Sequence, residues 1–272
     1  MIPKDFITEW RSQAPWVTDA QVEQDLVISR ALVEIFREPQ LATKLAFRGG
    51  TALFKLHLQA ARYSEDIDLV QVAPEPIGQT FAAIRAVLDP WLGEPRRTIK
   101  EASVSLVYRF TSEEVPPKPM RLKVEINSRE HFTEHGHVHH RFELRSRWWS
   151  GRADITTFSL EELLGTKLRA LFQRRKGRDL FDLWYALQNG ADPQKIVTCF
   201  ARYMQEANRA VTRAEFGQNL TAKLADPVFR ADLSPLLRTG IAWDADAAGE
   251  VVLAKLVARL PDEPRKRPKR RG

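Results

Sequence analysis

The chain has 272 residues, of which 43% are hydrophobic and 28% charged, an ordinary globular composition with room for one large domain or two modest ones. No run reaches the roughly 18 consecutive apolar residues of a membrane-spanning helix, and a single cysteine excludes an internal disulfide framework. Because residues 1–5 also lack the apolar core of a signal peptide, we expect a cytoplasmic protein with no membrane partner.

The net charge of +7 is concentrated at the C-terminal end of the sequence. Residues 265–271 hold six basic side chains and no acidic one; removing these six from the 42 basic residues leaves 36, against 35 acidic ones. We predict that residues 261–272 form a disordered basic tail, which either keeps the protein soluble or binds phosphates electrostatically. The remaining chain is close to neutral, so any basic surface on it requires local clustering.

The apolar periodicity and the positions of Gly and Pro predict the elements in chain order. The N-terminal part is predicted to contain helices and strands over 19–37 (helix, capped by Asp19), 45–48 (strand), 51–58 (helix), 66–70 (strand), 76–88 (helix, with Pro90 beyond its end), 97–111, 120–129, 137–146 and 153–158 (all extended). From Ser159 onward the pattern is helical, over 160–175, 178–189, 193–207, 212–224 and 246–259. These elements predict an α+β fold: a mixed sheet flanked by helices over 1–158, then an all-helical domain over 159–260.

A glycine turn opens the helix predicted at 51–58. Gly49 and Gly50 allow close approach of a phosphate to the backbone, and the helix that begins at Thr51 offers N–H groups and the positive end of its dipole. Such a turn alone fits either a phosphate site or an ordinary structural turn.

Two aspartates alternate on the strand predicted at 66–70. Asp66 and Asp68 are two residues apart, so their carboxylates project from one face. Carboxylates this close repel one another unless a cation lies between them, as in a Mg²⁺ site; the alternative is a solvated polar face of an edge strand. If the strand at 120–129 pairs beside this one, Glu125 joins them, and the three carboxylates would surround one or two Mg²⁺ ions, with Glu125 accepting or orienting a proton.

The order of these parts is similar to that of the DNA polymerase β-type nucleotidyltransferase superfamily. The longer strings, Phe47-Arg48-Gly49-Gly50-Thr51-Ala52-Leu53 and Arg62-Tyr63-Ser64-Glu65-Asp66-Ile67-Asp68-Leu69, more specifically resemble the AbiEii/AbiGii-type toxins of toxin–antitoxin and phage-abortive systems, including the MenT toxins. The resemblance continues in Gly165–Leu171 and Arg174–Leu183, which look like the family's lysine helix and its Arg-Asp-x-x-Asp segment.

The resemblance implies a polymerase β-like fold and roles for further residues. Gly49, Gly50, Thr51, Ser64 and Lys167 would bind the phosphates of an NTP. Asp179 and Asp182, which share a helix face, would orient Lys167 or position Arg178, unless they belong to a surface ion-pair network. The resemblance also implies that the helical domain over 159–260 completes the active site. The basic residues of the same region would bind RNA or a triphosphate, unless they form an ordinary solvated helix face: Arg169, Arg174, Arg175, Lys176 and Arg178.

The resulting hypothesis is a Mg²⁺-dependent toxin that transfers NMP from an NTP to RNA. The resemblance implies the tRNA 3′ end as acceptor, growth arrest as outcome and a cognate antitoxin as partner. Two alternatives stay open: a small-molecule transferase of the aminoglycoside type, and a non-catalytic nucleotide- or RNA-binding regulator.

Two clusters fit several interpretations. The histidines at 131, 135, 137, 139 and 140 could bind a transition metal or form a basic hairpin near nucleic acid, and Trp148-Trp149 could stack on bases or pack internally.

Overall fold

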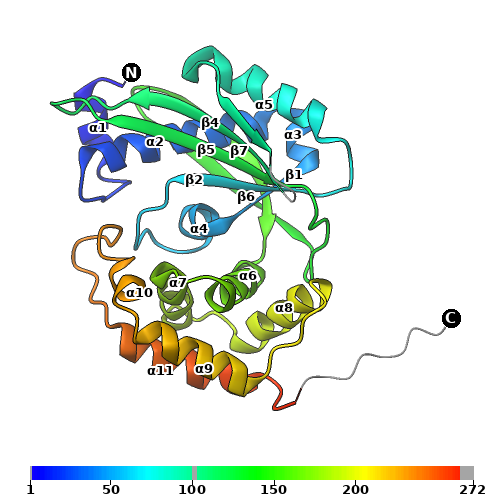
Figure 1. Ribbon diagram of the computed structural model, residues 1–272. Coiled ribbons are helices and arrows are strands. Elements are labelled where there is room, and N and C mark those ends of the chain that lie inside the picture. The colour runs from blue at the N-terminus through cyan, green and yellow to red at the C-terminus, as the bar shows by residue number, and fades with distance from the viewer. Residues whose placement is uncertain (1, 100–102, 264–272) are drawn as a thin grey trace. The chain divides into compact units, whose positions relative to one another are not determined.

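A computed structural model describes residues 2–99 and 103–263 (Figure 1). The chain divides into two units. The first comprises the chain up to Ser159 together with Leu236–Ile241, and the second comprises Leu160–Pro235 and the chain from Ala242 onward. Most of the predicted basic tail, residues 264–272, lies outside the described residues. In the described ranges, no helix is both long and apolar enough to cross a bilayer.

The first unit is built on a seven-stranded mixed sheet of order β3-β4-β5-β2-β1-β7-β6. Its strands are β1 (Leu45–Arg48), β2 (Asp66–Gln71), β3 (Arg96–Ile99), β4 (Ser103–Thr111), β5 (Pro119–Asn127), β6 (His137–Arg145) and β7 (Ser150–Phe158). β2 pairs antiparallel with β1 and parallel with β5, and β1 pairs parallel with β7. The antiparallel pairs β3–β4, β4–β5 and β6–β7 complete the sheet. The predicted α+β fold with a mixed sheet is confirmed.

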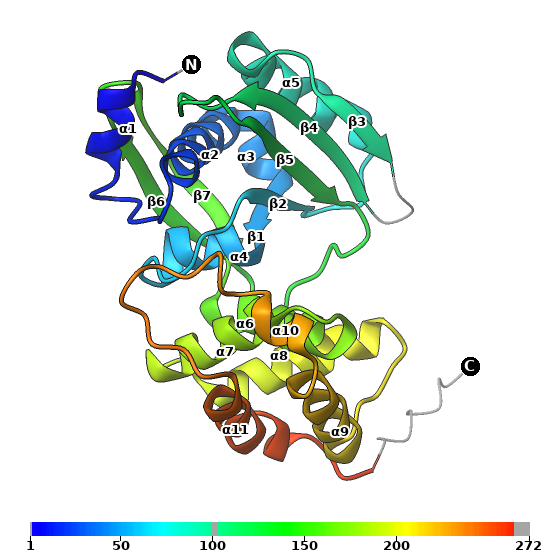
Figure 2. The ribbon, with the colours of Figure 1, turned by 60° about the vertical axis from the view of Figure 1, so that its left-hand side comes forward.

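Helices α2 (Asp19–Arg37), α3 (Pro39–Lys44) and α5 (Ile77–Leu92) contact one another and the sheet (Figure 2). The predicted apolar stripe of α2 is buried against strands β5, β2, β7 and β6. Each large apolar side chain buried in this way contributes about 1.5–3 kcal/mol. Helix α1 (Lys4–Trp10), which the periodicity missed, packs on α2.

Several predicted boundaries were wrong for identifiable reasons. The cap of α2 is Thr18 rather than Asp19, because the Thr18 side chain accepts from Gln21 N and the Gln21 side chain accepts from Thr18 N. Pro39 follows the end of α2 and is the first residue of α3. A backbone N–H at that position would have no acceptor within the helix, so proline costs no hydrogen bond there. Pro90 lies inside the last turn of α5 rather than beyond its end, and its missing N–H removes a helical hydrogen bond there.

β1 runs directly into the short helix α4 (Gly49–Ala52), which continues as a π-helical turn over Leu53–His57. The glycine turn, Gly49 and Gly50, is therefore the start of the helix, whereas the sequence pattern predicts a start at Thr51. The chain then returns to the sheet as β2. This connection places the turn, α4 and the start of β2 together, and α4 contacts β1 and β2.

The second unit is helical, as predicted. It contains α6 (Leu160–Gln173), α7 (Gly177–Gln188), α8 (Pro193–Glu206), α9 (Arg213–Leu224), α10 (Pro227–Ala231), α11 (Ala245–Lys255) and a 3₁₀ turn at Val257–Arg259. α6 packs against α7 and α8, and α7 packs against α11. Helix α10 is an addition to the predicted set.

Candidate active site

The two aspartates of β2 lie on the face of the strand that does not enter the core. Ile67 and Leu69 are 0% and 1% exposed, whereas Asp66 and Asp68 alternate with them and are half-buried. This arrangement follows from the two-residue period of a strand. The carboxylates therefore project together from one face of β2, as expected.

β5 places two more charged side chains beside this pair. In the parallel register, Lys123 lies opposite Asp66 and Glu125 lies opposite Asp68. Residues that are paired across adjacent strands share a face. The expected pairing that brings Glu125 beside the aspartates is thus confirmed, and it also brings an ammonium group that we had not anticipated.

The surroundings of Asp66 disfavour its charged form. Burial, followed by the neighbouring Asp68, raises the pKa of Asp66 from 3.8 to about 6, while Lys123 opposes this shift. Although burial favours the neutral amine, the hydrogen bond to Glu125 and the nearby carboxylates raise the pKa of Lys123 overall. Lys123 also forms an ion pair with Glu125. It therefore acts as the internal counterion of the carboxylate face.

The donor set suits a hard divalent cation. Mg²⁺ takes oxygen ligands, retains several waters, and is commonly held by one or two carboxylates together with substrate phosphates. Asp66 and Asp68 fit this description, since burial and then the charge of Asp68 raise the pKa of Asp66, and a bound cation would favour the charged form that both causes oppose. Within residues 2–99 and 103–263, no three carboxylate, imidazole or thiolate groups form a ready-made metal site.

Replacing Lys123 by Met should make the stability of the protein more dependent on Mg²⁺. Without the ammonium group, the repulsion among the carboxylates is offset only by an added cation, so the metal-free protein should lose about 1 kcal/mol. Differential scanning fluorimetry should therefore show a lower Tm without Mg²⁺ and a larger rise in Tm on its addition than in the wild type.

Lys118→Met is the matched control, because Lys118 pairs with Glu114 away from the carboxylate face. Its response to Mg²⁺ should equal that of the wild type. Equal responses of the Lys123 and Lys118 variants would show that Lys123 is not the counterion of this face.

The glycine turn is shaped around the carboxylates. Gly49 has φ +85°, a conformation that side-chain-bearing residues rarely adopt, and a Cβ at this position would lie 2.2 Å from Asp68 Oδ2. A Cβ at Gly50 would lie 2.5 Å from Arg62 Nη2 and 3.1 Å from Ser64 Oγ. Both glycines are therefore needed for the close approach of the backbone to functional side chains.

The hydroxyl of Thr51 is used within the protein. Thr51 Oγ1 lies 2.6 Å from the backbone oxygen of Asp66 and 2.9 Å from Ser64 Oγ, and the residue is 2% exposed. This geometry fixes α4 to the start of β2. It supports a positioning role for Thr51, whereas the half-buried Ser64 remains available as a candidate phosphate contact.

The second unit contains a buried ion-pair cluster. Lys167 Nζ on α6 lies 2.9 Å from Asp182 Oδ2 and 3.4 Å from Asp179 Oδ1, and both aspartates on α7 are fully buried. Arg174 Nε approaches Asp179 Oδ2 at 2.7 Å. Of the two partners foreseen for these aspartates, Lys167 is the observed one, since Arg178 pairs with Asp232 instead.

Comparison with known proteins identifies the family. The model of the family described as "Nucleotidyl transferase AbiEii toxin, Type IV TA system" matches residues 30–251, most of the chain. The chain belongs to this AbiEii family. It is therefore a nucleotidyltransferase of the toxin class of type IV toxin–antitoxin systems, a class that implies a cognate antitoxin.

Solved structures share the AbiEii fold. The MenT4 nucleotidyltransferase toxin from Mycobacterium tuberculosis is 15% identical with a TM-score of 0.66, covering 96% of this chain and 91% of its own. JHP933 from Helicobacter pylori is 18% identical with a TM-score of 0.58, covering 89% and 93%. A further Helicobacter pylori structure, assigned as a nucleotidyltransferase, has the same identity and TM-score and covers 89% and 96%. No curated protein sequence matches the chain significantly.

The basic segment of this AbiEii protein is largely neutralised by acidic side chains of its own unit. Arg175 contacts Asp226 at 3.5 Å, and Lys176 and Arg178 contact Asp232 at 3.2 and 3.4 Å. Arg169 instead lies over the ring of Tyr203. The basic side chains of these pairs are 35–71% exposed, whereas Asp226 and Asp232 are only 20% and 11% exposed, so the cations are accessible from solvent. RNA binding by this segment remains a prediction.

The histidine cluster and the tryptophan pair make internal contacts. His131 Nδ1 lies 2.9 Å from Gln71 O, and the ring of His140 packs on that of His57. Burial and then His140 lower the pKa of His57 to about 4. Trp148 and Trp149, with Trp91, surround the guanidinium of Arg30 at 4.0–5.6 Å. These aromatic rings form a cation–π cluster, which accounts for Trp148-Trp149 without bound bases.

Sequence reasoning missed Lys123 and the buried pair Asp25–Lys55. Lys123 stands two residues before Glu125, so the same strand alternation that selected Glu125 could have selected it. Asp25 lies beside Leu26 on the buried side of α2, and a charge among core residues is a signal for a partner. Its partner Lys55, 30 residues away, could not be read from the pattern.

Proposed function

We propose that this AbiEii protein is a Mg²⁺-dependent enzyme that transfers a nucleoside monophosphate from an NTP to the 3′ end of tRNA. The observation that carries the proposal is the pair Asp66 and Asp68, held on one strand face against the glycine turn, with a pKa of Asp66 raised to about 6. Such a pair is unfavourable without a cation and is suited to binding one.

In this reaction the acceptor hydroxyl oxygen bonds to the α-phosphorus, the bond from that phosphorus to the bridging oxygen breaks, and pyrophosphate leaves. The backbone at Gly49 and Gly50 and the Ser64 hydroxyl would hold phosphate oxygens, and Glu125 would accept or orient the hydroxyl proton. Bound Mg²⁺ would be held by Asp66 and Asp68, with Glu125 as the third carboxylate once its ion pair with Lys123 opens, and it would neutralise phosphate charge and lower the pKa of the attacking hydroxyl.

The cluster around Lys167 is proposed to take part in the same reaction. A lysine held by two fully buried carboxylates has a fixed position, and its charge is suited to phosphate oxygens. Lys167→Met and Asp182→Asn should therefore both reduce the transfer rate. Comparing these rates with that of the wild type tests whether the cluster around Lys167 takes part in the reaction. Because removing one partner also leaves a buried charge unpaired, each variant needs a Tm measurement beside its rate.

Transfer to different acceptors tests the proposal. Purified protein is incubated with Mg²⁺, each of the four NTPs labelled at the α-phosphorus, and either total tRNA, tRNA shortened at its 3′ end, an aminoglycoside or no acceptor. We expect label in intact tRNA only, with one NTP preferred. Labelled aminoglycoside with unlabelled tRNA would establish the small-molecule alternative, and an absence of label from every acceptor would favour a non-catalytic binding protein.

A further inference from the structure

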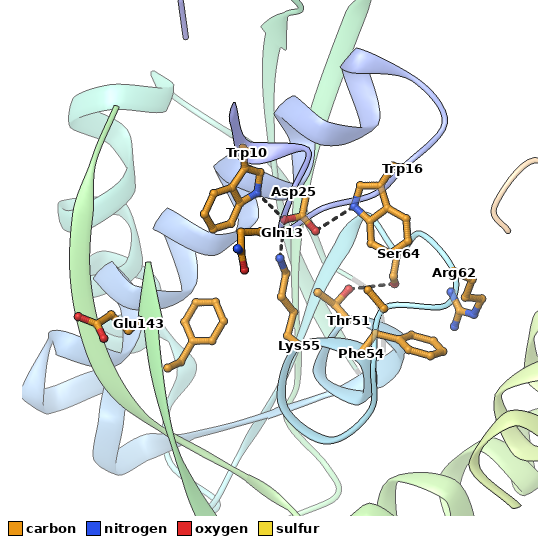
Figure 3. A pocket seen from close by; sticks show the side chains of 12 residues that line it. Trp10, Gln13, Trp16, Asp25, Thr51, Phe54, Lys55, Arg62, Ser64 and Glu143 are labelled. Atoms are coloured by element: carbon orange, nitrogen blue, oxygen red, sulfur yellow. Dashed lines mark hydrogen bonds and ion pairs between the residues drawn. The ribbon is translucent and has the colours of Figure 1, made fainter. Parts of the chain in front are cut away.

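A pocket in the first unit lies next to the glycine turn, and most of its lining residues have no role in the reaction described above (Figure 3). It has a volume of about 180 Å³ and is formed by α1 and the segment after it, α2, the helical stretch from Thr51 to Lys55, the chain before β2, and β6. Its lining includes the rings of Trp10, Trp16, Phe54 and Phe142. This volume suits one heteroaromatic group and excludes a folded segment of protein or paired nucleic acid.

The aromatic walls are held rigidly. Trp10 Nε1 and Trp16 Nε1 donate to the two carboxylate oxygens of Asp25 at 2.9 and 3.1 Å (Figure 3). Lys55 Nζ donates to Asp25 at 2.6 Å and to Ser29 at 2.9 Å. Rings oriented in advance bind a planar ligand with little loss of conformational entropy.

The polar groups of the pocket favour a ligand that is neutral and able to form hydrogen bonds. The lining holds two cations, Lys55 and Arg62, and two carboxylates, Asp25 and the exposed Glu143, so its charges balance and it does not select a multiply charged ligand. Hydroxyl, ammonium and guanidinium donors of Ser64, Lys55 and Arg62 line the pocket and match carbonyl and hydroxyl acceptors.

The pocket is continuous with the proposed phosphate site through shared residues. Thr51 and Ser64 line it, and Arg62 lies between it and Gly50, where an added Cβ would meet the guanidinium at 2.5 Å. A nucleotide is the ligand class that combines a planar heteroaromatic base, a sugar with hydroxyl groups and an attached phosphate, and its nucleoside part is the portion that would occupy this pocket.

We propose that this pocket binds a nucleoside, with its base among Trp10, Trp16, Phe54 and Phe142 and its sugar directed toward Ser64. The inference rests on the proposed function for the identity of the ligand, but binding itself requires no transfer. The nucleoside is either that of the NTP or the 3′-terminal nucleoside of the acceptor, and these share the same chemistry.

Calorimetry with nucleosides that carry no phosphate tests the pocket apart from the reaction. Adenosine, guanosine, cytidine and uridine are titrated separately into the full-length wild-type protein without Mg²⁺. We expect at least one nucleoside to bind with a Kd of about 1 mM or lower, and we expect Phe142→Ala to raise that Kd at least about tenfold. Phe142 is half-buried on an edge strand, so its truncation should leave the fold intact.

Phe110→Ala, which removes a half-buried ring from β4 outside the pocket, is the control and should bind as the wild type does. Lys55→Met is a second pocket variant, checked for folding by circular dichroism, and it should also weaken binding. Absence of binding by all four nucleosides to the wild type, or equal affinities of the Phe142 and Phe110 variants, would overturn the proposal.

Kinetics with Phe142→Ala distinguish the two sources of the nucleoside. A raised KM for the NTP with an unchanged KM for tRNA assigns the pocket to the NTP, and the reverse result assigns it to the acceptor. If nucleosides bind as expected but no acceptor is ever labelled, nucleoside binding in the pocket is supported and the proposed transfer activity is contradicted.

Discussion

Asp66→Asn is expected to reduce the rate of nucleotide transfer by about 10³-fold or more while making the metal-free protein more stable. The loss of rate follows from the loss of a negatively charged oxygen ligand on the proposed cation site. The gain in stability follows from the pKa of Asp66, which lies at about 6 in the folded protein, above its ordinary value of 3.8. Ionising this side chain therefore opposes folding, and asparagine removes that charge.

The sign of the shift sets the pH dependence. A carboxyl group whose pKa is raised by folding stabilises the protonated fold below pH 3.8, and this contribution is lost as the pH rises through about 6. After allowance for solvent screening of the half-buried side chain, the difference is about 1–2 kcal/mol at pH 7. The Tm of metal-free Asp66→Asn should exceed that of the wild type at pH 7, and the two should converge toward pH 4.

Asp154→Asn on β7 is the matched control, since Asp154 is an exposed aspartate of the same sheet away from the carboxylate face. It should change neither the transfer rate nor the response of Tm to Mg²⁺. A transfer rate of Asp66→Asn within about threefold of the wild type would rule out Asp66 as a cation ligand.

Gly49→Ala should abolish transfer and lower stability, although only one methyl group is added. The backbone conformation at φ +85° costs about 1–2 kcal/mol with a side chain present, and the new Cβ would meet Asp68 Oδ2 at 2.2 Å. Since that distance is impossible, either Asp68 or the turn must move, and both belong to the proposed site. We expect a fall in Tm of several degrees together with a loss of Mg²⁺ response.

Gly136→Ala separates the effect of backbone strain from the effect of the contact between the added Cβ and Asp68. Gly136 also has a positive φ, +79°, but a Cβ there would meet nothing within 4 Å. This variant should show the backbone strain in its Tm and keep full transfer activity. Similar activities of the Gly49 and Gly136 variants would show that the contact with Asp68 has no functional importance.

The carboxylate face was predictable because its signals are local. Strand alternation alone placed Asp66 and Asp68 together, and the alternation around Glu125 gave the correct face once β5 paired with β2. The same period also applied to Lys123, but a basic residue on a proposed metal face was not sought. The helical second unit was equally accessible, because its apolar repeats are long and regular.

The remaining features depend on tertiary contacts between distant residues. The ion pair of Arg175 joins residues 51 positions apart, so the basic segment looked more positive in the sequence than it is in the fold. The aromatic pocket combines Trp10 with Phe142, which no local pattern connects. Thr51 was assigned to phosphate binding from its position after the glycines, whereas its hydroxyl bonds within the unit.

The origin of the transferred phosphorus tests the central claim most directly. Wild-type protein and Asp66→Asn are incubated in parallel with Mg²⁺, tRNA and an NTP labelled at either the α- or the γ-phosphorus. If the enzyme is a nucleotidyltransferase that depends on the β2 carboxylates, the wild type should label tRNA only from the α-phosphorus and release the γ-label as pyrophosphate. Asp66→Asn should do neither. Label in tRNA from the γ-phosphorus, or equal labelling by the two proteins, would contradict it.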